Sequence, residues 1–255
     1  MTTTRTTLAQ QQFGPSAAEY ATNAYHAAGP DLRLLDEVAA LSGEERVLDC
    51  GTGAGHTALL LARQAREVVG IDVTGEMLEA ARALAAARRI ENVRFELADA
   101  CSLPYPDGSF DVVSNRQSAH HYADLGRALD ETRRVLRPGG RFLLIDTVAP
   151  EDAGLDTFLN CVELLRDASH VRDWRASEWV RMLEGRGFAV TIHDRFVIPL
   201  DGQDWTTRMR TPATRVAMIR ELFATATPAQ RAAFDLRDEP WGWTIEAILL
   251  EAVKR

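Results

Sequence analysis

Over the first 150 residues, segments with helical spacing of apolar residues alternate with short, continuous apolar runs. Segments with apolar residues every three or four positions indicate helices with one buried face, and they fall at 31–41, 57–66, 74–88 and 124–137. Short apolar runs typical of buried strands fall at 46–49, 68–72, 93–97, 110–114 and 141–146. This alternation of strands and helices predicts a doubly wound (Rossmann-like) α/β fold, with a mostly parallel sheet covered by helices on both faces.

The alternation of predicted strands and helices becomes less regular after Pro150. Helical spacing recurs at 155–165 and 177–185, and two further strands are predicted at 188–200 and 244–253. The stretch between these strands is mostly helical and holds three tryptophans, Trp205, Trp241 and Trp243. These rings either roof an apolar substrate pocket or cover the edge of the sheet.

Length and charge narrow the class of protein. The chain has 255 residues, enough for one elaborated domain with its own core. Its three cysteines form no C-x-x-C pair, so we expect neither a disulfide framework nor a metal site. The net charge of −8 and the lack of a basic run disfavour nucleic acid and anionic membranes as partners. No apolar leader or membrane span is evident, which favours a cytoplasmic protein.

A glycine-rich loop, Gly51-Thr52-Gly53-Ala54-Gly55, connects the first strand to the next helix. Glycines allow a tight turn and the close approach of a ligand. The G-x-G-x-G spacing differs from the G-x-G-x-x-G expected for a dinucleotide. Asp49, just before the loop, would repel a diphosphate but would suit a cationic amino group.

Two further acids follow the next strands. Asp72 ends the second strand, where a carboxylate binds a ribose diol, and Asp99 follows the third, where it would accept from an adenine amino group. A nucleoside joined to a cationic amino acid is S-adenosylmethionine (SAM). The strand ends therefore predict SAM as the cofactor.

The motifs around these acids resemble those of class I SAM-dependent methyltransferases, and most closely the small-molecule group typified by the ubiquinone/menaquinone-biosynthesis methyltransferases. The resemblance covers residues 13–147 and rests on VLDCGTGAG at 47–55, GID at 70–72, ADA at 98–100, LPYPD at 103–107, SFDVV at 109–113, AHH at 119–121 and LRPGG at 136–140. It implies a seven-stranded sheet of order 3-2-1-4-5-7-6 with an antiparallel last strand. SAM would lie across the carboxyl ends of the first strands.

The resemblance also implies a cofactor site. Asp49 and the glycines would hold the methionine part, Asp72 the ribose, and Asp99 the adenine amino group. The full expected set is Tyr20, Asp49, Gly51, Thr52, Gly53, Gly55, Asp72, Val73, Met77, Asp99, Ala100 and Arg116. We expect a single domain over 1–255: an unstructured start at 1–12, N-terminal cap helices at 13–42, a SAM-binding core at 43–150, and substrate-side insertions with the last two strands at 151–255.

The loop after the fourth strand would face the transferred methyl group. If the acceptor is a phenol, enol or activated carbon, a histidine base would help, so His120 or His121 is the candidate general base. The alternative is that they only bond neighbouring backbone. Two adjacent histidines are not expected to point into one site. Ser114-Asn115-Arg116-Gln117 departs from the family's Asn/Asp-Pro-Pro-Tyr/Phe motif, which argues against a nucleobase or amide nitrogen as acceptor.

Residues that would contact the substrate are less sharply marked. The candidates are His26, Phe158 and Trp205. Arg208, Arg210 and Arg215 either bind an acidic substrate group or form a solvated face.

The expected function is methyl transfer from SAM to a small, apolar or aromatic metabolite, with S-adenosylhomocysteine (SAH) as product. The alternatives are a cyclase-like enzyme that binds SAM without methyl transfer and, against the loop spacing, a nicotinamide dehydrogenase. The expected partner is a small-molecule substrate, and the expected state is a monomer or a homodimer.

Overall fold

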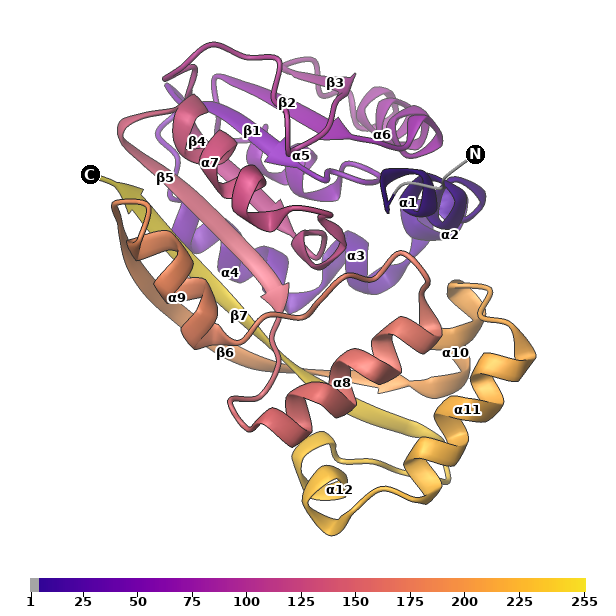
Figure 1. The fold of residues 1–255 in the computed structure, drawn as a ribbon. Coiled ribbons are helices and arrows are strands. Elements are labelled where there is room, and N and C mark those ends of the chain that lie inside the picture. The colour runs from indigo at the N-terminus through magenta and orange to yellow at the C-terminus, as the bar shows by residue number, and fades with distance from the viewer. Residues whose placement is uncertain (1–4) are drawn as a thin grey trace.

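A seven-stranded sheet forms the centre of the computed structural model, which describes residues 5–255 (Figure 1). Its strand order is β3-β2-β1-β4-β5-β7-β6, and only β7 runs antiparallel to its neighbours. The strands are β1 (Arg46–Cys50), β2 (Glu67–Asp72), β3 (Val93–Leu97), β4 (Phe110–Arg116), β5 (Leu136–Thr147), β6 (Phe188–Asp201) and β7 (Gly242–Lys254). The fold class and strand order implied by the resemblance are confirmed.

Helices cover both faces of the sheet because successive strand residues point to opposite sides. In β1, Val47 packs in the core cluster beneath α4 (Pro30–Ala39), α5 (His56–Leu61) and α6 (Gly75–Arg88). Its neighbour Leu48 packs in the opposite cluster, beneath α7 (Leu125–Val135) and α9 (Ala176–Glu184).

Several element ends differ from the predicted ones. Helix α5 ends at Leu61, five residues earlier than predicted, while β5 begins at Leu136 instead of 141. The early start reflects a register shift, since Leu136 pairs with Phe110 but Arg141 pairs with Val112. The turn at 137–140 therefore lies within β5 instead of before it.

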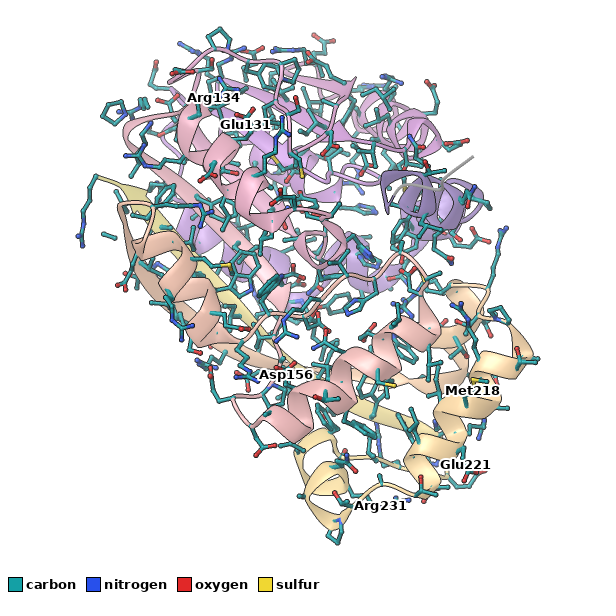
Figure 2. The ribbon with its side chains drawn as sticks, in the orientation of Figure 1. Glu131, Arg134, Asp156, Met218, Glu221 and Arg231 are labelled. Carbon is teal, nitrogen blue, oxygen red and sulfur yellow. The ribbon has the colours of Figure 1, made fainter. Side chains whose placement is uncertain are left out.

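Polar contacts fix the connections between these elements. Arg134, near the end of α7, pairs with Glu131 at 2.8 Å (Figure 2). It also donates to the carbonyl oxygens of Leu103 and Tyr105, at 2.9 and 2.6 Å. The loop that follows β3 is thereby held against α7.

The N-terminal segment is helical. Helix α1 (Arg5–Phe13), a short 3-10 turn η1 (Gly14–Ser16), α2 (Ala17–Thr22) and α3 (Ala24–Ala28) precede α4. Gln10 donates to the carbonyl of Val73 at 2.8 Å, and Gln12 donates to that of Met209 at 2.6 Å. The expectation of an unstructured start is wrong for residues 5–12, because these tertiary bonds tie the helix down; residues 1–4 lie outside the described part.

A second helical layer covers the far ends of β6 and β7, beyond the point where β5 stops (Figure 1). Its helices are α8 (Ala153–Arg166), α10 (Gly202–Arg208), α11 (Ala213–Ala224) and α12 (Pro228–Phe234). Aromatic rings fill the space between this layer and the strands, with Phe158 stacked on Phe234 at 5.5 Å and Trp205 edge-on to Trp243 at 5.1 Å.

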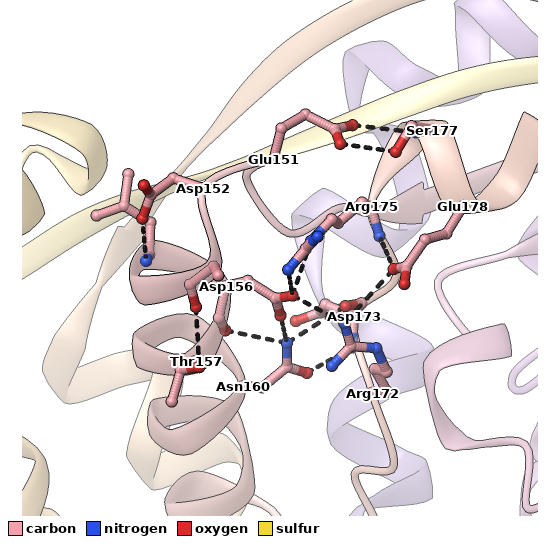
Figure 3. A network of polar contacts seen from close by, with 12 residues as sticks. Glu151, Asp152, Asp156, Thr157, Asn160, Arg172, Asp173, Arg175, Ser177 and Glu178 are labelled. Atoms are coloured by element: carbon pink, nitrogen blue, oxygen red, sulfur yellow. Dashed lines mark hydrogen bonds and ion pairs between the residues drawn. The ribbon is translucent and has the colours of Figure 1, made fainter.

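A polar network joins α8 to the segment 167–175 (Figure 3). The buried carboxylate of Asp156 accepts hydrogen bonds from Arg172 and Arg175, both at 2.8 Å, and from Asn160 at 2.7 Å. Asn160 in turn accepts from the backbone amide of Asp173 at 2.8 Å. The network fixes the position of α8 relative to the sheet. Within the described residues, no helix is both long and apolar enough to cross a membrane.

Candidate active site

The glycine loop turns sharply between β1 and α5, and its three glycines have different surroundings. All three have positive φ values, +66° at Gly51, +51° at Gly53 and +86° at Gly55. A Cβ at Gly51 would collide with the side chain of Ser118, whereas a Cβ at Gly53 would point into open space. At Gly55 it would press on Ala81 and Phe95, so that glycine serves packing between α5 and α6.

Asp49 holds this loop from beneath. It is 1% exposed and accepts hydrogen bonds from Thr52 Oγ1 and Ser114 Oγ, both at 2.7 Å. Burial raises its pKa to about 6. The sequence placed Asp49 against the methionine part of the cofactor, but in the structure it positions Thr52 and lies behind the cavity wall.

A cavity of about 150 Å³ opens above the loop at the carboxyl ends of β1, β2 and β4. It is lined by every predicted cofactor residue except Asp49 and Gly55: Tyr20, Gly51, Thr52, Gly53, Asp72, Val73, Met77, Asp99, Ala100 and Arg116. Helix α1 closes one side of it with Ala9 and Phe13.

The two acids at the strand ends are fixed by backbone amides. Asp72 accepts from the amides of Gly53 and Thr74, both at 2.9 Å, and burial raises its pKa. Asp99 accepts from the amide of Cys101 at 2.8 Å. Both carboxylates line the cavity, and the open space at Gly53 leaves room for a ligand against the loop. These residues fit the ribose, the adenine amino group and the amino-acid end of SAM.

Arg116 lines the cavity, but its guanidinium group forms its hydrogen bonds with other protein residues. It forms a buried ion pair with Asp31 of α4, with nitrogen–oxygen distances of 2.6 and 3.1 Å. It also donates to the carbonyl oxygens of Tyr25 and His26, at 3.3 and 3.1 Å. Its chief role is therefore to anchor the N-terminal helices to β4.

A second cavity, of about 360 Å³, adjoins the first. The two share a wall made of Phe13, Tyr20, His26, Gln117 and His121. Trp205 and His26, two of the predicted substrate residues, line the second cavity. Phe158 does not: the prediction that it contacts substrate is wrong, since its ring lies in the core of the helical layer between Phe223 and Phe234.

The tryptophans and arginines of the helical insertion, for which two roles each were considered, lie in different environments. Trp241 and Trp243 are core residues and line neither cavity. Arg208 lines the second cavity, whereas Arg210 is on the surface and pairs with Glu19 at 3.1 Å. Arg215 lines neither cavity, so among the three arginines only Arg208 is placed where it could contact a ligand in one of these two cavities.

His120 and His121 lie on a 3-10 turn, η2 (Ala119–His121), after β4, with ring centroids 4.2 Å apart. Both line the second cavity, contrary to the expectation that only one would, and only His121 lines the first as well. His120 Nδ1 lies 2.6 Å from Asp146 Oδ1 at the end of β5. His121 Nδ1 lies 3.2 Å from Ser169 Oγ, and its Nε2 lies 3.9 Å from Asp167.

The two histidines have opposite charge preferences. Burial opposes a charge on His120, but the Asp146 carboxylate outweighs it and raises the pKa of His120 to about 9. Burial and then the neighbouring His120 cation lower the pKa of His121. At neutral pH His120, which lines only the second cavity, is therefore a cation. His121, which lies in the wall shared by both cavities, is an uncharged base.

Two further polar residues of the second cavity were not predicted from the sequence. Glu163 and Arg166 at the end of α8 line it, and burial raises the pKa of Glu163 to about 7. Helical periodicity alone cannot separate them from the core face of α8. Asp146, which bonds His120 behind this cavity, could have been found from the sequence, because it lies at the end of the predicted fifth strand, 141–146, as Asp72 does at the end of the second.

Comparison with known proteins agrees with this geometry. A methyltransferase-domain family matches residues 48–144. An uncharacterized methyltransferase, YcgJ of Bacillus subtilis, is 40% identical over 247 residues, covering 95% of this chain and 98% of that protein. Its crystal structure superposes with a TM-score of 0.85 over 88% of this chain and 97% of that one.

Two more distant proteins are informative. The demethylmenaquinone methyltransferase of Thermus thermophilus is 44% identical over 127 residues, covering 48% of this chain and 57% of that protein. The crystal structure of the [4+2]-cyclase SpnF is 25% identical, with a TM-score of 0.64 over 98% of this chain and 97% of that one. The extent of the match to YcgJ, the methyltransferase domain and the sheet order together establish that this chain belongs to the class I SAM-dependent methyltransferases.

Proposed function

We propose that this protein binds SAM in the first cavity and methylates a small metabolite, with an apolar or aromatic body, held in the second. The observation that carries the proposal is the shared wall, since a cofactor and an acceptor must meet for a methyl group to pass between them. The wall contains a histidine, His121, that reaches both spaces.

The residues of the first cavity have separable roles. Asp72 would accept from the ribose hydroxyls and Asp99 from the adenine amino group, while Met77 would pack against the adenine. Val73 and Ala100 offer backbone at the rim, and Tyr20 and His26 would cover the methionine end. When bound, SAM supplies an activated methyl group on a positively charged sulfur.

His121 is the proposed general base. A phenol, enol or activated carbon must lose a proton as it becomes a nucleophile, and a neutral imidazole can accept it. Its uncharged state follows from its burial and from the His120 cation beside it. His120 and Asp146 act as positioning residues, because their ion pair fixes the turn that carries His121.

The acceptor would lie against the apolar part of the second cavity. Trp205, Ile198 and Ile245 form that part, and His26 borders it on the cofactor side. An aromatic or branched apolar body suits these side chains. The demethylmenaquinone methyltransferase that matches the cofactor half acts, by its name, on such an aromatic molecule, which supports this class of acceptor.

The test is transfer of labelled methyl from SAM to a panel of phenols, enols and a small-metabolite extract. We expect a labelled product and an equal amount of SAH. Failure of SAM to bind in calorimetry, or binding with no labelled product from any acceptor, would contradict the proposal.

A second function is supported by one observation, the similarity to the [4+2]-cyclase SpnF over nearly the whole chain. In that case SAM would remain bound and unchanged while the second cavity held a substrate that cyclises. Product formation without SAH release, in the same assay, would favour this alternative.

A further inference from the structure

Two arginines line the second cavity, Arg166 and Arg208, and the acid nearest to each among the described residues lies beyond hydrogen-bond distance, at 3.8 and 3.6 Å. Arg166 ends α8 and Arg208 ends α10, and their side chains are only 12% and 14% exposed. Arg166 reaches α10 through a bond to the carbonyl of Trp205, three residues before Arg208, and both arginines line the same cavity. Burial and then the positive charge of Arg166 lower the pKa of Arg208. Both charges also act on the Tyr20 hydroxyl at the shared wall.

The contacts of Arg166 leave it partly free. Its Nε donates to the carbonyl of Trp205 at 3.2 Å, and its guanidinium lies 4.8 Å from the centre of the Trp205 ring. The nearest acid, Glu163, is 3.8 Å away, beyond hydrogen-bond distance. Because burial raises the pKa of Glu163 to about 7, this carboxyl is only a partial counter-charge at neutral pH.

Arg208 is less compensated still. Its buried Nε has no hydrogen-bond partner among residues 5–255. Its nearest acid is Asp204, at 3.6 Å, whose side chain is 68% exposed. The other buried acids bond elsewhere: Asp146 to His120, Asp167 to Ser169, and Asp173 to Thr147.

A buried charge without a hydrogen-bonded partner is costly, and two like charges in one low-dielectric site repel each other. An anionic oxygen group placed between them would relieve both costs, because a guanidinium presents its N–H groups in a fork that matches a carboxylate. Glu163 and Asp204 already lie within 4 Å of the pair, so a singly charged anion suits the site better than a dianion.

We propose that Arg166 and Arg208 bind a carboxylate of the substrate, so that the acceptor is an apolar-bodied carboxylic acid. This assignment rests on the proposed function for the identity of the cavity as a substrate site. Arg166 and Arg208 line only the second cavity, whereas Asp72 and Asp99, the acids expected to meet SAM, line only the first.

The experiment uses the full chain saturated with SAH and three matched probes: 3-phenylpropanoate, 3-phenylpropanamide and 2-phenylethyl phosphate. Dissociation constants are measured by ligand-observed NMR. We expect the carboxylate to bind about tenfold or more tightly than the amide, since charge-assisted hydrogen bonds distinguish them. Equal binding of acid and amide, or no detectable carboxylate binding, would overturn the proposal; tighter binding of the phosphate would overturn the carboxylate assignment.

Variants of Arg208 test whether the preference for the acid over the amide depends on this side chain. Arg208→Met should abolish the preference for the acid over the amide, and Arg208→Lys should restore part of it. Arg195→Met is the matched control, because Arg195 is 51% exposed on β6, pairs with Glu246 and lines neither cavity. It should leave the preference unchanged.

The same samples separate three outcomes. If the chain does not bind SAH, the proposed function fails before any probe is added. If SAH binds normally but no carboxylate preference exists, only the present inference fails. If Arg208→Met weakens binding of SAM itself tenfold, the arginines serve the cofactor's own carboxylate and the inference is wrong.

Discussion

His120 and Asp146 are joined by two contacts, a 2.6 Å bond between Nδ1 and Oδ1 and a 3.1 Å bond from the His120 amide to Oδ2. One carboxylate at the end of β5 thus fixes both the ring and the backbone of the turn after β4. The bond also keeps His120 charged, and that charge disfavours a second cation on His121. Burial and the His120 cation together keep the proposed base uncharged, and Asp146 contributes by holding the charge on His120.

Replacing Asp146 by asparagine should change the titration of both histidines. The pKa of His120 should fall from about 9 because its anionic partner is lost. The pKa of His121 should then rise, since the neighbouring cation disappears at neutral pH. NMR titration of the imidazole Cε1–H signals of His120 and His121 would measure both changes. Unchanged titration of His120 would refute the ion pair.

The same pair should make stability depend on pH. A histidine whose folded pKa of about 9 exceeds its ordinary value of 6.5 contributes stability that is complete below pH 6.5 and is lost as the pH rises through 9. The shift corresponds to roughly 3 kcal/mol in the free energy of unfolding. Urea unfolding between pH 7.5 and 9.5 should show this decline in the wild type and a flatter curve in Asp146→Asn. The same pH dependence in the wild type and in Asp146→Asn would argue against a contribution of this ion pair to stability.

His121→Asn should reduce turnover by about a hundredfold or more, the usual contribution of a general base. SAM affinity should stay near that of the wild type, because no hydrogen bond of the SAM-binding acids involves His121. Single-turnover kinetics with an acceptor from the methyl-transfer screen would measure the loss. A change in KM alone, with kcat intact, would mean that His121 only contacts the substrate.

Asp72→Ala should weaken SAM binding by about 1–3 kcal/mol through the loss of charge-assisted hydrogen bonds to the ribose. Glu79→Ala, on the exposed side of α6, is the control and should have no effect. Isothermal calorimetry gives the affinities directly. Equal affinities for the two variants would remove the ribose assignment.

Gly51→Ala and Gly53→Ala should differ in what they damage. Both incur the cost of a left-handed backbone, about 1–2 kcal/mol. Gly51→Ala also drives a methyl group into Ser118, so it should lower stability more. The new methyl group of Gly53→Ala points into open space at the cavity wall and should lower SAM affinity more. Urea unfolding and calorimetry on both variants would test this reversal.

The strand ends could be predicted from sequence because their signals are local. A short apolar run, an acid and a glycine loop lie next to one another in the chain, and parallel strands bring such ends to one edge of the sheet. Asp72 and Asp99 were found in this way, and both line the cavity. The same pattern suggested that Asp49 faces the ligand, but hydrogen bonds from Thr52 and Ser114 draw its carboxylate beneath the loop.

The substrate side could not be predicted in the same way. Phe158 and Glu163 lie on one helix, and which of them faces the cavity depends on α11 and α12, some sixty residues further along the chain. The adjacent histidines were misjudged because contacts distant in the chain orient their rings: Asp146 of β5 bonds His120, Ser169 bonds His121, and the second cavity extends along both rings.

The pairing of Asp201 with Gly242 has a consequence for how this fold can vary. The forty residues from 202 to 241, which carry Trp205 and Arg208, leave the sheet and return to it at partners in one ladder. A segment whose two ends already meet can change in length at little entropic cost, since closure grows only with the logarithm of length. The segment that carries Trp205 and Arg208 can therefore change in length without separating β6 from β7, and the contacts that such a change would alter first are those with the N-terminal helices, such as the bond from Gln12 to Met209.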